Sequence, residues 1–171
     1  VPKNQLIELT KGSLTLGNLI VEPFALSHDA ADPIGINVFA GKDKATVVTD
    51  TGVISDSILR RMDDTTLLVL EANYDPHMLR FGPYQPFLKQ RVASDEGHLS
   101  NEMAAQALLM MNRPDFMQVI LAHRSENNNN AVLVTQTIGK MLVDGGVRIG
   151  PEMKLQHGQP NEIVSMKSVK R

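Results

Sequence analysis

Short apolar segments alternate along the chain with segments of helical periodicity, and this alternation predicts a layered α/β fold. The apolar segments are rich in Val, Leu and Ile, which is typical of buried strands. We expect strands within residues 14–26, 34–39, 45–50, 66–71 and 116–122, and a hairpin over residues 153–167. We expect helices over residues 55–62, 75–80, 86–92, 101–111 and 131–143.

Composition narrows the class of protein. The 171 residues suit one domain, 1–171, and 42% of them are hydrophobic, which is enough for a packed core. The absence of cysteine excludes disulfides and thiolate metal sites. A net charge of −2 argues against nucleic-acid binding by bulk charge but allows a local basic patch. The sequence has no apolar run of membrane-spanning length and no signal-peptide pattern, so we expect a cytoplasmic protein without membrane contact.

Four of the expected strands run into polar residues of the kinds that bind metals. His28 and His123 follow two of these apolar segments, and Asp50 and Glu71 end two others. Because the loops at the carboxyl ends of strands converge on one crevice in α/β folds, we expect these side chains to lie together. Imidazole and carboxylate ligands suit zinc, or manganese where more oxygen ligands are present.

Each of these residues also has an ordinary interpretation. A lone histidine after a strand is more often a loop residue than a ligand. Asp50 in Asp-Thr-Gly is typical of a turn, and Glu71 alone would be a solvated strand end. Four strand ends of the same kind favour a metal site over these interpretations, but their spacing names neither the metal nor the reaction.

Seven motifs carry a resemblance to a known family. They are SHDAADP (27–33), TDTG (49–52), LEANYDPHML (70–79), GPY (82–84), LKQR (88–91), GHLSNEMAA (97–105) and LAHRSENNN (121–129). Because these motifs occur in the order of the family, the chain resembles the metallo-β-lactamase superfamily, and within it the bacterial YycJ (WalJ) group of predicted DNA exonucleases. GHLSN together with AHxSxxNN is specific to this group, whereas TDTG alone is a weak signal.

The resemblance implies roles for five residues. His28 matches the histidine that completes the ligand set of a first metal, and Asp50 matches the aspartate that bridges two metals. His123 matches the last histidine, which binds the second metal. His98 matches a histidine that lies near the scissile phosphate in nuclease branches, and Glu71 matches an acidic residue that orients it. The implied cofactors are two divalent ions, Zn or Mn, and the implied substrate is DNA.

The mechanism implied by the resemblance is hydrolysis of a phosphodiester bond by a water that two metals activate. Lys89 and Arg91 lie just before GHLSN and are candidates for contacts with phosphate oxygens, although a solvated helix face is the more ordinary interpretation of both. Ser100 and Asn101, within GHLSN, are further candidates for substrate binding.

One motif of the family is missing. The H-x-H-x-D-H loop of the family supplies four ligands, and the five histidines of this chain include no such group. We therefore expect the C-terminal half of an αββα sandwich, weak or partial metal occupancy, and no nuclease activity from these 171 residues alone. An exposed apolar face would favour a homo-oligomer or pairing with the missing N-terminal segment.

Two other functions stay open beside the nuclease. The first is hydrolysis of another ester or thioester on the same fold, against which GHLSN and Glu71 favour the nuclease branches. The second is an inactive interaction module, which would explain the missing motif. The presence of His28, Asp50, His98 and His123 together argues against that module, because only chemistry requires this set.

Overall fold

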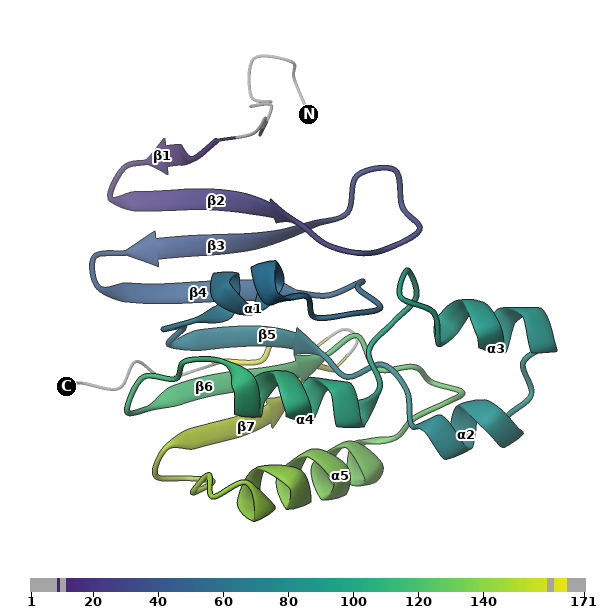
Figure 1. Cartoon of the computed structure of the whole chain (residues 1–171). Coiled ribbons are helices and arrows are strands. Elements are labelled where there is room, and N and C mark those ends of the chain that lie inside the picture. The colour runs from purple at the N-terminus through teal and green to yellow at the C-terminus, as the bar shows by residue number, and fades with distance from the viewer. Residues whose placement is uncertain (1–8, 10–11, 160–161, 166–171) are drawn as a thin grey trace.

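A computed structural model of the protein describes residue 9, residues 12–159 and residues 162–165. In this part of the chain seven strands form one sheet, and their order in the sheet is their order in the sequence (Figure 1). The strands are β1 (Leu14–Leu16), β2 (Leu19–Ala25), β3 (Ile34–Ala40), β4 (Asp43–Val48), β5 (Leu67–Glu71), β6 (Met117–Ala122) and β7 (Met153–His157). Strands β1 to β4 pair antiparallel, and strands β4 to β7 pair parallel. The mixed sheet confirms the expected α/β class.

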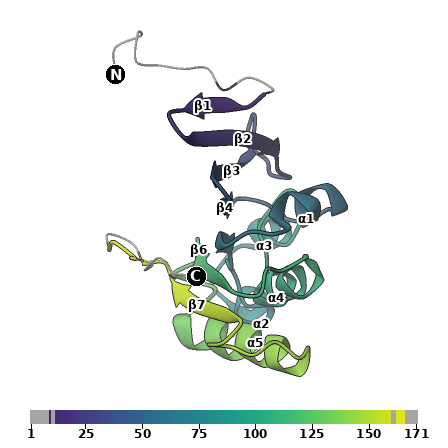
Figure 2. The same cartoon turned by 90° about the vertical axis from the view of Figure 1, so that its left-hand side faces the viewer.

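Helices link the parallel strands and lie on one face of the sheet (Figures 1 and 2). They are α1 (Asp56–Met62), α2 (Pro76–Phe81), α3 (Pro86–Val92), α4 (Asn101–Met110) and α5 (Ala131–Asp144). Four of them begin at a residue whose side chain accepts a hydrogen bond from a backbone N–H of the first turn, and these residues are Ser55, Asp75, Ser100 and Asn130. Such caps satisfy donors that a helix leaves unpaired at its start, so these helices begin where the sequence supplies a cap.

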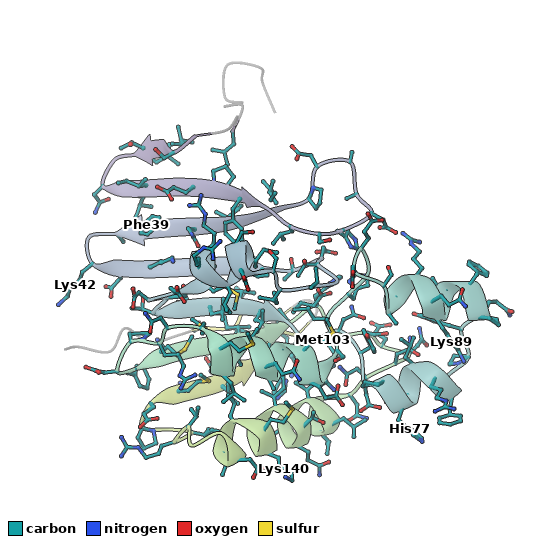
Figure 3. All side chains as sticks on the ribbon, in the orientation of Figure 1. Phe39, Lys42, His77, Lys89, Met103 and Lys140 are labelled. Carbon is teal, nitrogen blue, oxygen red and sulfur yellow. The ribbon has the colours of Figure 1, made fainter. Side chains whose placement is uncertain are left out.

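Helices α2 and α3 extend past the carboxyl ends of the strands (Figure 1). His77 on α2 and Lys89 on α3 consequently lie at one end of the molecule, whereas Lys42, between β3 and β4, lies at the other (Figure 3). The remaining helices pack on the sheet itself.

The hydrophobic core lies between the sheet and helices α1, α4 and α5. Val48, Leu70 and Leu121 are paired neighbours on β4, β5 and β6, and their exposed fractions are 0%, 0% and 2%. Met62 and Ile138 contribute fully buried side chains from α1 and α5. Burial of this aliphatic row fixes the register of the parallel strands, because a slip by one residue would turn it to the other face.

The opposite face of the sheet carries apolar side chains without a helical layer in the described residues (Figure 2). Val47, Val69 and Ile120 form the next paired row, and they are only partly buried, with Val47 37% exposed. Ile34 on β3 is 43% exposed. The exposed apolar face expected for half of a sandwich is therefore present, while association through it stays a prediction.

Two expectations from the sequence differ from the structure. The strand expected over residues 45–50 ends at Val48, because Asp50 has a φ of +63°, which an extended strand does not allow. Of the hairpin expected over residues 153–167, the described residues contain β7 alone. Residues 162–165 contain no strand, and the rest of its second arm falls outside the described residues. None of the helices in the described ranges is long and apolar enough to cross a membrane.

Candidate metal centre

The polar residues expected at strand ends meet at one edge of the sheet. Strand β2 runs in the same direction as β4, β5 and β6, so the carboxyl ends of these four strands point the same way. His28 lies in the loop after β2, Asp50 in the loop after β4 and His123 directly after β6, whereas Glu71 is the last residue of β5. His98 comes from the segment between α3 and α4 and joins them. The sequence expectation that these side chains lie together is confirmed.

Glu71 organises this cluster. It is fully buried, and its Oε1 lies 2.6 Å from Nδ1 of His98 and 2.9 Å from Nδ1 of His123. Its Oε2 accepts hydrogen bonds from the backbone N–H groups of Thr51, at 3.1 Å, and Leu99, at 3.4 Å. One carboxylate therefore fixes the orientation of two imidazole rings and ties together three loops.

The same contacts shift two pKa values. Burial acts to raise the pKa of Glu71, but the hydrogen bonds from His123 and His98 outweigh it and hold this pKa below its ordinary value. The hydrogen bond to Glu71 raises the pKa of His123 above its ordinary value, against the opposing effect of burial, and the charge of Asp50 adds to the increase. The lowered pKa of Glu71 and the raised pKa of His123 are both expected when an ionised Glu71 accepts hydrogen bonds from the two rings.

The hydrogen bonds also determine which ring nitrogens are free. A carboxylate accepts hydrogen bonds, so Nδ1 of His98 and of His123 carries the proton. Nδ1 of His28 lies 2.9 Å from the carbonyl oxygen of Gly97, which also accepts. In each of the three rings Nε2 is then the nitrogen that is available to bind a metal or exchange a proton.

The free donors lie close to one another. Donor atoms of Asp50, His98 and His123 are all within 4.8 Å of each other, and Nε2 of His28 is 3.9 Å from Oδ1 of Asp50. The ring centroids of His28 and His98 are 4.9 Å apart, and those of His98 and His123 are 5.1 Å apart. Zinc and similar divalent ions accept imidazole and carboxylate donors, so Asp50, His98 and His123 fit one metal ion, and His28 lies beside Asp50.

The backbone is strained at two of these residues. Asp50 and His123 have φ angles of +63° and +51°, in the left-handed region that non-glycine residues rarely adopt. Each such residue costs on the order of 1 kcal/mol or more, so the surroundings must hold it in place. The side chain of Asn73 donates a 2.8 Å hydrogen bond to the carbonyl oxygen of His123. Strain at two candidate ligands is a feature of functional sites.

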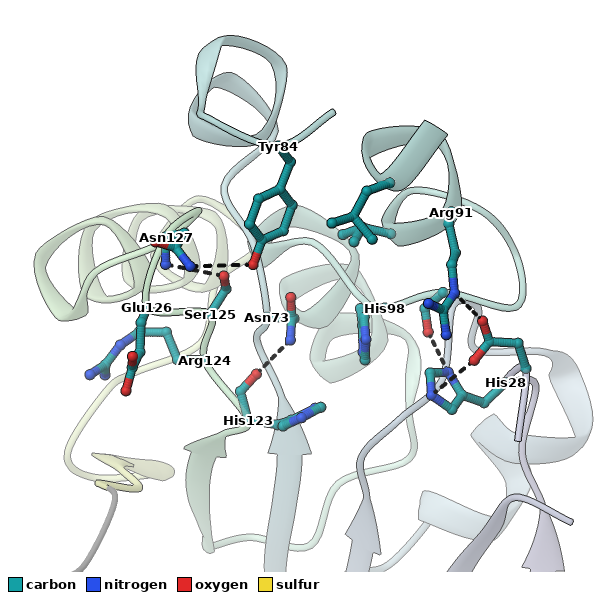
Figure 4. Close-up of a pocket in the computed structure, with 14 residues that line it drawn as sticks. His28, Asn73, Tyr84, Arg91, His98, His123, Arg124, Ser125, Glu126 and Asn127 are labelled. Atoms are coloured by element: carbon teal, nitrogen blue, oxygen red, sulfur yellow. Dashed lines mark hydrogen bonds and ion pairs between the residues drawn. The ribbon is translucent and has the colours of Figure 1, made fainter. Parts of the chain in front are cut away.

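A cavity of about 420 Å³ opens above the histidines (Figure 4). Tyr84, Leu88 and Arg91 line it on the side of α3, and Arg124 lines it on the side of the loop after β6. The rings of His28, His98 and His123 border the cavity, so a ligand in it would touch the cluster.

Asp29 and Arg91 form an ion pair beside the cluster (Figure 4). They are 62 positions apart in the chain, and Oδ1 of Asp29 also lies 3.5 Å from Nε2 of His28. The hydrogen bond from Arg91 lowers the pKa of Asp29, so this carboxylate stays ionised. The sequence pattern gave Asp29 no role, although it lies within the motif SHDAADP.

The predicted substrate-binding residues divide into two groups. Arg91 lines the cavity. Lys89 instead donates a hydrogen bond to the carbonyl oxygen of Arg80, and Ser100 is the buried cap of α4. Asn101 is fully buried and exchanges hydrogen bonds with Asn129. Lys89, Ser100 and Asn101 are not among the described residues that line the cavity, and a contact of any of them with substrate stays a prediction.

Asn73, Tyr84 and Arg124 are among the residues of the cavity wall that sequence reasoning missed. Asn73 and Tyr84 lie in the motifs LEANYDPHML and GPY, and Arg124 directly follows His123. Their position within motifs was the available signal. Their roles follow from contacts between distant segments, which no local pattern encodes.

Comparisons with known proteins show the family of the chain. Residues 2–123 match the model of the family described as "Beta-lactamase superfamily domain". The chain is 32% identical over 161 residues to "Exodeoxyribonuclease YycJ" of Bacillus anthracis, covering 94% of this chain and 61% of that protein. It is 33% identical over 147 residues to "Exodeoxyribonuclease WalJ" of Streptococcus pneumoniae, covering 86% of this chain and 55% of that protein. The chain thus spans little more than half the length of these curated relatives.

Solved structures show the same fold. The metallo-β-lactamase fold protein YhfI from Bacillus subtilis aligns with a TM-score of 0.58 at 15% identity, covering 85% of this chain and 50% of that one. Unliganded yeast PDE1 aligns with a TM-score of 0.56 at 13% identity, covering 90% of this chain and 47% of that one. At such low identity these likenesses concern the fold alone.

Proposed function

This chain belongs to the beta-lactamase superfamily, and from that premise we propose that its histidine cluster is part of the catalytic centre of a metal-dependent DNA exonuclease. The observation that carries the proposal is the buried carboxylate of Glu71, which orients His98 and His123 with Nε2 of each ring free. Residues 1–171 would form one partial domain of this enzyme. The names of the two curated relatives support DNA as the substrate.

His28, Asp50 and His123 are the proposed metal ligands. Both histidine rings lie beside Asp50, with Nε2 of His28 at 3.9 Å and Nδ1 of His123 at 3.6 Å from its Oδ1. The half-exposed carboxylate of Asp50 has a second oxygen with which to bridge two ions. Divalent ions bound there would activate a water and stabilise the charge that develops on the phosphate. Zn and Mn both suit the donor set.

His98 is the proposed proton donor. Its Nδ1–H is held by Glu71, so a proton on its Nε2 would face the cavity, where the oxygen of the leaving nucleotide needs one. Glu71 is a positioning residue because it acts on substrate only through the rings that it holds. This division leaves His28, Asp50 and His123 for the metal.

Arg91 is the proposed phosphate contact. Its side chain is 62% exposed at the cavity wall and its present partner is Asp29. A guanidinium forms paired hydrogen bonds with phosphate as readily as with a carboxylate, so a DNA phosphate would compete with Asp29 for it.

The three proposed ligands His28, Asp50 and His123 suffice for one metal ion with an open position but not for two. We therefore propose that residues 1–171 by themselves bind divalent ions weakly and do not cleave DNA measurably.

The experiment compares the product of the entire open reading frame that encodes this chain with its Asp50→Ala variant. Metal content is measured after dialysis, and release of nucleotides from end-labelled DNA is measured with Mn²⁺ or Zn²⁺. The unchanged protein should retain metal and degrade DNA, whereas Asp50→Ala should lose both. Asp43→Ala, which removes an exposed carboxylate at the start of β4, is the matched control. Full activity in Asp50→Ala would remove the basis of the proposal.

A further inference from the structure

The segment from Pro76 to Val92, here named the α2–α3 arm, differs in charge from the rest of the chain. It contains Arg80, Lys89 and Arg91 and no acidic residue, although the whole chain has a net charge of −2. The arm extends past the strand ends (Figure 1), and its basic side chains are not neutralised from within the arm. An anionic partner is the complement of such a surface.

The arm also concentrates aromatic side chains. The chain has five Phe and two Tyr, and three of these seven are Phe81, Tyr84 and Phe87. Phe81 is 67% exposed and Phe87 is 70% exposed, and they are the only aromatics among the exposed large hydrophobic residues of the described chain. Exposed rings on a basic surface suit a partner that offers both flat apolar faces and negative charge.

The rings of the arm are accompanied by cationic and polar groups. The guanidinium of Arg80 lies 5.3 Å from the ring centroid of Phe81, and the ring of His77 lies 4.6 Å from it. At the other end of the arm, Tyr84 and Arg91 line the cavity above the histidine cluster. Aromatic rings and cations therefore occur together along the sequence of the arm, and Tyr84 and Arg91 carry this composition to the cavity wall.

The arm is anchored to the rest of the protein. Tyr74, Leu79 and Val92 are buried together, and Tyr84 and Leu88 pack against them. Gly82 allows a close approach at the bend, because a Cβ there would lie 2.5 Å from the carbonyl oxygen of Met78. The exposed rings are thus presented from a packed base, which lowers the entropic cost of binding.

We propose that the α2–α3 arm is a binding platform for single-stranded DNA, which guides an unpaired strand into the cavity. The bases stack on Phe81 and Phe87, and the phosphates contact Arg80 and the other cations of the arm. Stacking requires unpaired bases, so the platform distinguishes a single strand from a duplex. The inference rests on the proposed function for its choice of DNA, whereas the platform itself rests on the charge and the rings of the arm.

The test measures binding of a fluorescein-labelled single strand of about 20 nucleotides, and of its blunt duplex, by anisotropy in EDTA, where no metal-dependent cleavage occurs. The protein is the product of the entire open reading frame. Phe81→Ala and Phe87→Ala should each weaken single-strand binding about 10-fold and leave duplex binding nearly unchanged. Met110→Ala, which removes a side chain 68% exposed on α4, is the matched control and should bind as the unchanged protein does.

Salt dependence tests the phosphate contact. Arg80→Gln should make the fall of log affinity with log salt less steep by about 0.7 for the single strand. Lys42→Gln, at the other end of the molecule (Figure 3), should leave the slope unchanged. The unfolding midpoints of all variants should match, because every substituted side chain is exposed.

The outcomes separate this inference from the proposed function. Normal single-strand binding by both Phe variants, or an equal loss for single strand and duplex, overturns the platform. If Asp50→Ala abolishes cleavage while the Phe variants bind normally, the nuclease stands and the platform fails. If the Phe variants lose binding but the unchanged protein cleaves no DNA, the platform stands and the nuclease fails.

Discussion

Nδ1 of His98 lies 2.6 Å from Oε1 of Glu71, a carboxylate that has no exposed surface. A buried charge is tolerated only when it is paired and hydrogen-bonded, and here two imidazoles and two backbone N–H groups supply the partners. Because the partners come from separate loops, the arrangement of the site and the stability of the fold depend on the same carboxylate.

Glu71→Gln should reduce both stability and activity. Both rings donate to Oε1 and two backbone N–H groups donate to Oε2, so the NH₂ group of the amide would face either the two ring donors or the two backbone donors. We expect a loss of about 2 kcal/mol in the free energy of unfolding and a loss of roughly 10- to 100-fold in DNA cleavage. Urea unfolding and cleavage of end-labelled DNA measure the two effects. Glu152→Gln, which breaks an exposed pair with Arg148, is the control, and an equal effect there would contradict the account.

The pair of Glu71 and His123 predicts a pH window of stability in the metal-free protein. The lowered pKa of Glu71 contributes stability above the ordinary pKa of 4.5, and this is lost as pH falls through the lowered value. The raised pKa of His123 contributes stability below 6.5, and this is lost as pH rises through the raised value. The unfolding free energy of the protein minus that of Glu71→Gln should therefore be largest between pH 4.5 and 6.5.

This subtraction also removes an opposing effect. Burial lowers the pKa of His157, so its protonation destabilises both proteins equally as pH falls below 6.5. The unfolding free energies of the protein and of Glu71→Gln are compared from about pH 4 to about pH 9. A difference between them that does not change with pH would show that Glu71 and His123 do not share a proton-linked contact.

Asp29→Asn should strengthen DNA binding. The substitution removes the carboxylate that occupies Arg91 and leaves the guanidinium free for a phosphate. An exposed ion pair of this kind is worth at most about 1 kcal/mol, so we expect an affinity increase of up to about fivefold. The slope of affinity against salt should become steeper by about 0.7. Asp32→Asn, in the same loop and exposed, should give a smaller change in slope, and equal slopes in the two variants would exclude the competition.

Asn129→Ala should destabilise the fold much more than Asn127→Ala, although the two residues stand in one run of four asparagines. Asn129 is buried and donates to the carbonyl oxygens of Ala72 and Asn73, besides its exchange with Asn101. Its loss leaves buried groups unpaired and should cost about 3 kcal/mol. Asn127 is exposed and should cost less than about 0.5 kcal/mol. Thermal unfolding of the two variants measures both losses of stability, and equal losses would contradict this prediction.

Local patterns predicted most of the fold. The apolar segments became β2 to β7, and the Ser, Asp and Asn residues before helical segments became caps such as Asn130. The positions of His28, Asp50, Glu71 and His123 were predicted because carboxyl ends of strands that run in one direction meet at one edge.

Other features depend on contacts that no local pattern encodes. The pairing of Asp29 with Arg91 joins residues 62 positions apart, and the buried state of Asn101 depends on Asn129. The strand expected up to Asp50 ends at Val48 because Asp50 has a positive φ, which the apolar pattern before it does not predict. Short-range periodicity does not predict these features, because they are not encoded in the local sequence.

The most direct test of the catalytic centre is single-turnover cleavage of end-labelled DNA by the product of the entire open reading frame and its His98→Gln variant, with the metal content of both measured. The account predicts that cleavage falls by a factor of about 100 or more while metal content is unchanged, because His98 moves a proton and does not hold the metal. Cleavage at the unchanged rate in His98→Gln, or loss of the metal from it, would contradict the account.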